Sequence, residues 1–110
     1  MANKYFREAL IPSAATETTL YTVPTDSVVV ARSLRVTNAD AAVAAITVTQ
    51  YSSGSATAHY LLRSRNLSIN ATYDVLNGVP LVLEGGDTLK VTSSIASVHF
   101  YLSYLEMDRT

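Results

Sequence analysis

The segment Ser97–Met107, with the sequence SVHFYLSYLEM, decides the fold class of this chain. Its side chains alternate between apolar and more polar residues, which is the two-residue period of a β-strand with one buried face. The apolar face would carry Val98, Phe100, Leu102 and Tyr104, and the opposite face Ser97, His99, Tyr101, Ser103 and Leu105. The segment therefore predicts a strand that packs against a core on one side only.

Shorter segments of similar character fill the rest of the chain. They are rich in Val and Thr, whose branched side chains favour strands, and turn residues separate them roughly every 8–12 residues, as in a β-sandwich. The predicted strands cover residues 4–11, 18–23, 27–37, 43–51, 57–64, 67–76, 79–83, 88–93 and 97–107. We predict an all-β chain, a single antiparallel β-sandwich of about eight strands with a jelly-roll or immunoglobulin-like shape.

Local sequence adds detail to two strands. Arg32 falls in register with the apolar residues of 27–37, which predicts a β-bulge near residues 31–33 or a position at the rim of the sandwich. The segment 67–76 alternates as the last strand does, and its predicted apolar face carries Leu67, Ile69, Ala71, Tyr73 and Val75.

Three turns are predicted from Gly, Asn, Ser and Asp. Asn77-Gly78 is the best short hairpin signal in the chain and predicts that the flanking strands pair. Residues 52–55, SSGS, predict a second turn. Glu84-Gly85-Gly86-Asp87 predicts a third, because two carboxylates are too few for a calcium loop and glycine supplies turn conformations.

The length of 110 residues suits one domain, and 48% hydrophobic residues can form a core. We assign residues 12–110 to the sandwich domain and residues 1–11 to an N-terminal arm or edge strand that ends at Pro12. Eight basic and nine acidic residues give a net charge of −1, which predicts neither nucleic-acid nor membrane binding. The start of the chain lacks the apolar region of a secretory signal.

No motif in the sequence predicts an enzyme or a cofactor. The chain has no cysteine, so disulfides and thiolate metal sites are excluded. His59 and His99 stand alone, without the clustered ligands that zinc requires. There is no Gly-x-Ser-x-Gly sequence of a nucleophilic serine. We therefore expect neither catalysis nor a cofactor.

Tyrosine is the unusual component, with seven Tyr and no Trp. Uncharged strand faces that carry Tyr and Leu are typical of protein interfaces, although singly exposed apolar residues are also common on monomers. Two arginines on one strand face could bind a partner, and an N-terminal arm could dock. The predicted interface residues are Tyr5, Phe6, Arg7, Tyr51, Arg63, Arg65, Tyr101 and Leu105.

The order of three segments resembles a known group of proteins. The segments are residues 18–24 (TTLYTVP), residues 34–38 (LRVTN) and residues 80–89 (PLVLEGGDTL), followed by the aromatic last strand. This order is similar to that of small β-sandwich virion structural proteins of tailed bacteriophages, especially phages of cyanobacteria and marine bacteria. The resemblance covers residues 11–107 and rests on turns and strand ends, so it implies a fold and a particle component and carries over no catalytic residue.

The resemblance implies a non-enzymatic capsid decoration or cement protein, made in the bacterial cytoplasm and located in the virion. Its partners would be the major capsid protein or tail proteins and copies of itself. A tail, neck or baseplate protein is the first alternative. A carbohydrate-binding module that recognises a host-surface glycan is the second, because tyrosine faces of small β-sandwiches can stack on sugars.

Overall fold

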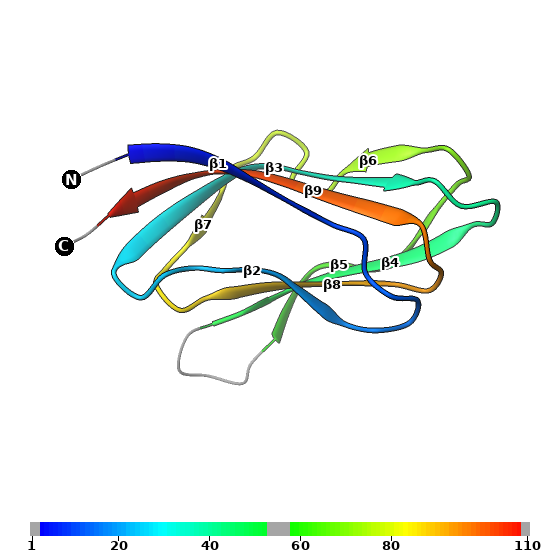
Figure 1. The fold of residues 1–110 in the computed structure, drawn as a ribbon, viewed down its shortest axis with the longest axis horizontal. Helices are drawn as coiled ribbons and strands as arrows, with labels where there is room; N and C mark the ends of the chain where they lie inside the picture. Colours follow the sequence, from blue (N-terminus) through cyan, green and yellow to red (C-terminus); the bar gives the residue numbers. More distant parts are fainter. Residues whose placement is uncertain (1–2, 53–57, 109–110) are drawn as a thin grey trace.

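The computed structural model describes residues 3–52 and 58–108, which form nine strands in two antiparallel sheets (Figure 1). The strands are β1 (Asn3–Leu10), β2 (Thr18–Thr22), β3 (Ser27–Asn38), β4 (Ala44–Tyr51), β5 (Ala58–Leu67), β6 (Thr72–Asp74), β7 (Leu81–Leu83), β8 (Thr88–Ser93) and β9 (Val98–Asp108). The predicted all-β fold is confirmed. No helix that could cross a membrane occurs in this described part of the chain.

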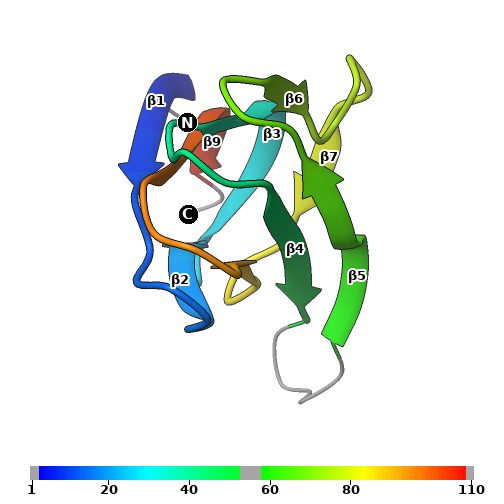
Figure 2. The ribbon, with the colours of Figure 1, turned by 90° about the vertical axis from the view of Figure 1, so that its right-hand side faces the viewer.

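The strand order identifies the shape of the sandwich. Sheet A has the order β1-β9-β3-β6, with β7 also on β3, and sheet B has the order β2-β8-β4-β5. Figure 2 shows the two layers from one end, with β1 at one edge of sheet A and β6 and β7 at the other. If β6 and β7 are counted as one interrupted strand, each sheet has four strand positions and most connections cross between the sheets. This arrangement is a jelly roll, which is one of the two predicted shapes, the other being the immunoglobulin-like sandwich.

The core lies between the sheets and follows the predicted alternation. Val98, Phe100, Leu102 and Tyr104 of β9 are at most 4% exposed. β3 supplies Val29, Leu34 and Val36, and sheet B supplies Ile46, Val48, Leu89 and Val91, all almost fully buried.

The predicted β-bulge in β3 is confirmed. The register of β3 against β9 shifts between Ala31 and Ser33. Arg32 occupies the extra position and is exposed, while Ala31 and Leu34 on either side are buried. The bulge therefore turns a charged side chain out of a strand whose alternation would bury it.

The predicted strand over 67–76 is wrong for most of its length. Leu67 is the buried last residue of β5, and the chain then turns, with Asn70 at a φ of 62° and the Ala71 amide donating to the Ser68 carbonyl at 3.1 Å. Only Thr72–Asp74 forms a strand, and Ile69 is 48% exposed. The turn at residues 68–71, with Asn70 in the left-handed region, interrupts the extended chain that alternation alone predicts.

The predicted hairpin at Asn77-Gly78 is also wrong. The turn itself forms, because Asn77 and Gly78 have φ values of 51° and 79° and the Val79 amide donates to the Leu76 carbonyl at 3.0 Å. However, β6 pairs with residues 35–37 of β3, and β7 pairs with residues 29–31 of the same strand. The two strands therefore run along one edge of β3 in the same direction, and residues 75–80 form the loop that connects them.

Of the two other predicted turns, only the one at 84–87 lies fully within the described residues. The turn at 84–87 is confirmed: the Glu84 amide donates to Asp87 Oδ2 at 2.9 Å, and the Asp87 amide donates to the Glu84 carbonyl at 3.0 Å. The predicted start of a strand at Thr57 and most of the turn at 52–55 lie outside the described residues.

Candidate interaction surface

The outer face of sheet A carries the candidate surface. Because strand side chains alternate, the buried residues of β9 leave Tyr101 and Ser103 facing away from the core. β1 runs antiparallel to β9 and places Arg7 opposite Ser103 and Ala9 opposite Tyr101. The bulge in β3 adds Arg32. These strands thus bring aromatic and cationic side chains from three parts of the chain to one region.

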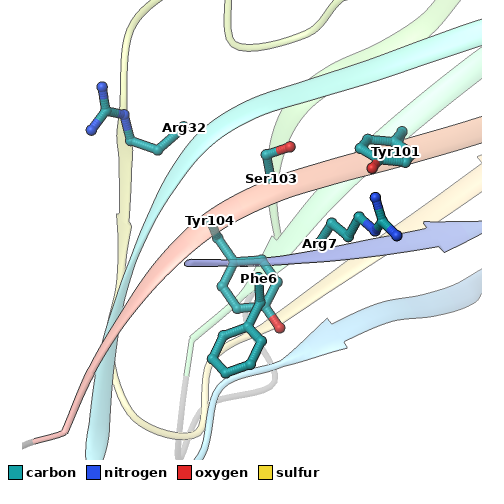
Figure 3. A pocket seen from close by; sticks show the side chains of 6 residues that line it. All are labelled: Phe6, Arg7, Arg32, Tyr101, Ser103 and Tyr104. Atoms are coloured by element: carbon teal, nitrogen blue, oxygen red, sulfur yellow. The ribbon is translucent and has the colours of Figure 1, made fainter. Parts of the chain in front are cut away.

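A hollow of about 670 Å³ lies in this region and is named the A-face groove (Figure 3). Figure 3 shows Arg7, Tyr101 and Ser103 along the two paired strands and Arg32 extending from β3. The residues that line it are Phe6, Arg7, Arg32, Tyr101, Ser103 and Tyr104. A smaller hollow of about 390 Å³ adjoins it at Tyr101 and includes Ile11 and His99.

The chemistry of the A-face groove is aromatic and positive. Phe6 is 42% exposed and Tyr101 is 39% exposed, so both rings offer apolar area to a partner. The two charged residues in the lining, Arg7 and Arg32, are both cationic and exposed. Guanidinium groups beside exposed rings suit a partner that brings carboxylates and apolar side chains.

Aromatic rings at the β1 edge connect the groove to the core. The rings of Phe6 and Tyr104 are 5.7 Å apart, and those of Tyr21 and Tyr104 are 4.4 Å apart. The Tyr21 hydroxyl donates to Glu106 Oε1 at 3.0 Å. Burial and then this hydrogen bond raise the pKa of Tyr21, and burial raises the pKa of Tyr104. Both tyrosines therefore stay protonated at neutral pH, and the ring contacts join Tyr104 in the groove lining to Tyr21.

The eight predicted interface residues lie in two separate places. Phe6, Arg7 and Tyr101 meet in the A-face groove. Leu105 is partly buried two residues beyond Ser103, and Tyr5 pairs with it in the register of β1 and β9. The side chain of Tyr5 lies outside what the structure describes.

The other three residues belong to sheet B and contact neighbours on the same chain. The Tyr51 hydroxyl donates to Glu17 at 3.3 Å, and Lys90 Nζ lies 4.6 Å from the centre of the Tyr51 ring. The guanidinium groups of Arg63 and Arg65 lie over the rings of Tyr60 and Tyr73, at 4.9 and 4.2 Å. Cation–π contacts of this kind hold the long side chains against the sheet.

Three groove residues were absent from the predicted interface: Arg32, Ser103 and Tyr104, which was predicted for the apolar face of the last strand. The alternation of β9 put Ser103 on the correct face, but a serine carries no interface signal of its own. Arg32 had a usable signal, because its conflict with the apolar register predicted the bulge that exposes it. What the sequence lacked was the pairing of β9 with both β1 and β3.

No metal site occurs among the described residues, where no three His, Cys, Asp or Glu side chains are close enough to hold an ion. His59 lies on β5 of sheet B and His99 on β9 of sheet A, and both are exposed.

Comparison with known proteins shows that other solved structures have a fold similar to that of this chain. No protein-family model and no curated protein sequence matches the chain. A chain of the T13 particle of infectious bursal disease virus is 11% identical, with a TM-score of 0.60 over 94% of this chain and 30% of the viral chain. A chain of the disulfide-linked pili of Bacillus endospore appendages is 12% identical, with a TM-score of 0.56 over 99% of this chain and 88% of the pilus chain.

A pentameric capsid protein from metagenomic phage sequences is 22% identical over 88% of this chain and 59% of that chain, with a TM-score of 0.40. That TM-score is too low to carry an argument. The solved structures that share this fold thus include chains of a viral particle and of a pilus, and this chain spans less than a third of the viral one.

Proposed function

We propose that this protein is a non-enzymatic structural component of a tailed-phage particle that binds the capsid as a decoration protein. The observation that carries the proposal is the A-face groove, an aromatic and cationic hollow on a rigid jelly roll. The fold supports it, because chains with this fold build a virus particle and a pilus. The order of the sequence segments supports the phage assignment.

The groove would act by burying surface. Tyr101 would lose exposed apolar area against a capsid subunit, and Arg7 and Arg32 would meet its carboxylates. Interfaces depend on a few aromatic and arginine anchors of this kind. Bound across neighbouring capsid subunits, the chain would stiffen the shell. Its partners would be the major capsid protein and other copies of itself, in a virion assembled in the bacterial cytoplasm.

A tail, neck or baseplate protein is the second candidate. It is favoured by the likeness to the pilus chain, which covers nearly the full length of both chains and belongs to a linear assembly. A glycan ligand at Tyr101 is the third, and it belongs to the outcomes of the test.

Immunogold labelling of particles from the phage whose genome encodes the chain separates these candidates. The decoration proposal expects antibodies against the recombinant chain to label heads. Label confined to tails would move the protein to the second candidate. Unlabelled particles, together with binding to a glycan array, would overturn the structural role.

A binding assay with empty heads then tests the groove. We expect Tyr101→Ala and Arg7→Ala each to weaken binding by on the order of tenfold or more, as for central interface residues. Tyr60→Ala, on the exposed surface of sheet B, is the matched control and should bind as the wild type does. Equal binding by all three variants would remove the A-face groove from the interface.

A further inference from the structure

The outer edges of the two sheets differ in regularity. β2 shifts register against β8 between Thr19 and Tyr21, and β5 shifts against β4 at two places. The edge beside β3 is broken into two strands of three residues each, β6 and β7. Breaks and bulges of this kind are two of the features by which natural sheets prevent pairing between edges of different molecules.

The fourth edge, β1, has none of these features. Its eight residues pair with β9 at consecutive positions, from Asn3 opposite Met107 to Leu10 opposite Phe100, without a register shift. It contains neither Pro nor Gly. Within the described residues no strand pairs with its other side, and Figure 2 shows it at the outside of sheet A. This edge is therefore open and regular enough to accept another strand.

The sequence of β1, NKYFREAL, is complementary to itself in one antiparallel register. If two copies pair about Phe6, each Lys4 lies opposite Glu8 of the other copy, and each Tyr5 lies opposite Arg7. Phe6 then lies opposite Phe6 of the other copy. Opposite charges and aromatic pairs at directly facing positions are the contacts that stabilise neighbouring strands.

We propose that β1 is a self-association edge, at which a second copy of this chain pairs antiparallel about Phe6. The two five-stranded A sheets become one continuous sheet. The ring of Phe6, now 42% exposed at the end of the Phe6–Tyr104–Tyr21 cluster, becomes covered by its counterpart. This pairing goes beyond the proposed function, since it concerns the isolated chain and holds wherever in a particle the protein sits.

A shifted register provides the main competing geometry. Centred on Arg7, it sets the two copies of Arg7 opposite each other and leaves Phe6 opposite Glu8 of the other copy. A shift of this size moves Lys4 away from Glu8 of the other copy, so substitutions at these two positions distinguish the registers.

Charge reversal on β1 provides the first test, read by sedimentation of the purified chain over a range of concentrations. Lys4→Glu and Glu8→Lys each place like charges opposite one another at both ends of the pair. Each should raise the dimer dissociation constant by about tenfold or more. An equimolar mixture of the two variants restores both opposite-charge pairs and should form a heterodimer, and the double variant should form a homodimer again.

Two matched controls alter charge without touching β1. Arg63→Glu lies on β5, the edge of sheet B, and Asp26→Lys lies in the exposed turn before β3. Both should dimerise as the wild type does. Thermal unfolding of every variant shows whether a lost dimer reflects a lost fold.

Disulfide trapping provides the second test, because the chain has no cysteine of its own. The register about residue 6 places the two copies of Phe6→Cys at a distance that a disulfide spans. Two copies of Ala9→Cys lie six positions apart along the strands, about 20 Å. We expect oxidation to link Phe6→Cys chains into dimers and to leave Ala9→Cys chains monomeric.

Several results would overturn the proposal. A wild-type chain that stays monomeric at the highest soluble concentration excludes the second copy as occupant. A dimer that the mixed variants fail to restore, or that links no faster through residue 6 than through residue 9, lies elsewhere or in another register. Protection of β1 amides only when heads are bound would assign the edge to another protein, and would leave the proposed capsid role intact.

Discussion

Two positions in the chain require glycine for different reasons. Gly85 is required because there is no space for a side chain, and Gly78 because of its backbone conformation. A Cβ added to Gly85 would clash with the backbone carbonyl oxygen of Thr25, because the 84–87 turn packs against the turn between β2 and β3. A Cβ added to Gly78 would meet nothing within 4 Å, but its φ of 79° is in the left-handed region. Gly85 is therefore required for space and Gly78 for backbone conformation.

Substitution by alanine measures these two demands. We expect Gly85→Ala to lower the free energy of unfolding by about 2–3 kcal/mol, because backbone must move to admit the new carbon. Gly78→Ala should cost about 1 kcal/mol, the penalty of a left-handed alanine. Urea denaturation of both variants gives the comparison. A Gly85 variant that is no less stable than the Gly78 variant would contradict the close approach.

Tyr21 gives the molecule a defined response to alkaline pH. Burial and the hydrogen bond to Glu106 raise its pKa above the ordinary value of 10.0. The folded chain therefore holds this proton more tightly than the unfolded chain does. The resulting stabilisation is present below pH 10 and is lost as the pH rises above it, because the unfolded chain then gains free energy by releasing the proton.

Tyr21→Phe tests this linkage. At pH 8 the variant should be less stable by about 1 kcal/mol, since the hydrogen bond to Glu106 is lost. Between pH 8 and pH 11 it should lose less free energy of unfolding than the wild type loses, because the titrating hydroxyl is gone. Urea denaturation at both pH values gives the two differences. Parallel losses in the two proteins would show that Tyr21 does not couple to folding.

At the scale of elements, Asn38 holds the ends of three strands together. It is fully buried at the end of β3, and its Nδ2 donates to the carbonyls of Ala42, before β4, and Leu67, at the end of β5, at 2.8 and 3.0 Å. Its Oδ1 accepts from the Asp40 amide at 2.9 Å. One side chain thus satisfies three backbone groups where the sheets connect.

Asn38→Ala should lower the free energy of unfolding by about 2–3 kcal/mol, because buried backbone groups lose their partners. Asn66→Ala, on the exposed surface of β5, is the control and should change stability by no more than about 0.5 kcal/mol. Thermal and urea unfolding check both variants. If Asn38→Ala is as stable as the control, water must replace the amide at this site.

Strands were predictable where burial follows strict alternation and were not where the backbone departs from it. β9 could be predicted because its residues alternate with a period of two. The bulge in β3 could be predicted because Arg32 interrupts that alternation. The end of β5 at Leu67 could not, because alternation does not encode the turn that follows it, in which Asn70 has a positive φ. Asn77-Gly78 correctly predicted a turn, but not which strands lie beside it.

At the scale of the whole molecule, we propose that residues 12–110 form the sandwich domain without the N-terminal segment. β1 pairs with β9 at an edge, so its removal leaves both sheets otherwise continuous. A chain that starts at Pro12 should keep one cooperative unfolding transition, at a lower temperature than the full chain, because β9 loses a neighbour. Calorimetry checks this. A truncated chain without a cooperative transition would make β1 part of the domain.

The candidate site was only partly accessible from the sequence. Tyr101 and Arg7 were chosen as residues with interface chemistry, and the pairing of β1 with β9 brings them together. Tyr51, Arg63 and Arg65 have the same chemistry but lie on sheet B, where each contacts a neighbour on the same chain. The type of a residue determines what its side chain can bind. Its position relative to residues far away in the chain depends on long-range pairing.

The amino-acid sequence by itself determined that this chain is all-β, which face of β9 is buried and where β3 bulges, because the period of two and its interruptions are local properties. Only the tertiary structure decided the jelly-roll order, the division of the predicted interface between two sheets and the open edge at β1. These depend on which strands pair, and hydrogen bonds between distant backbone segments leave no mark in the order of the side chains.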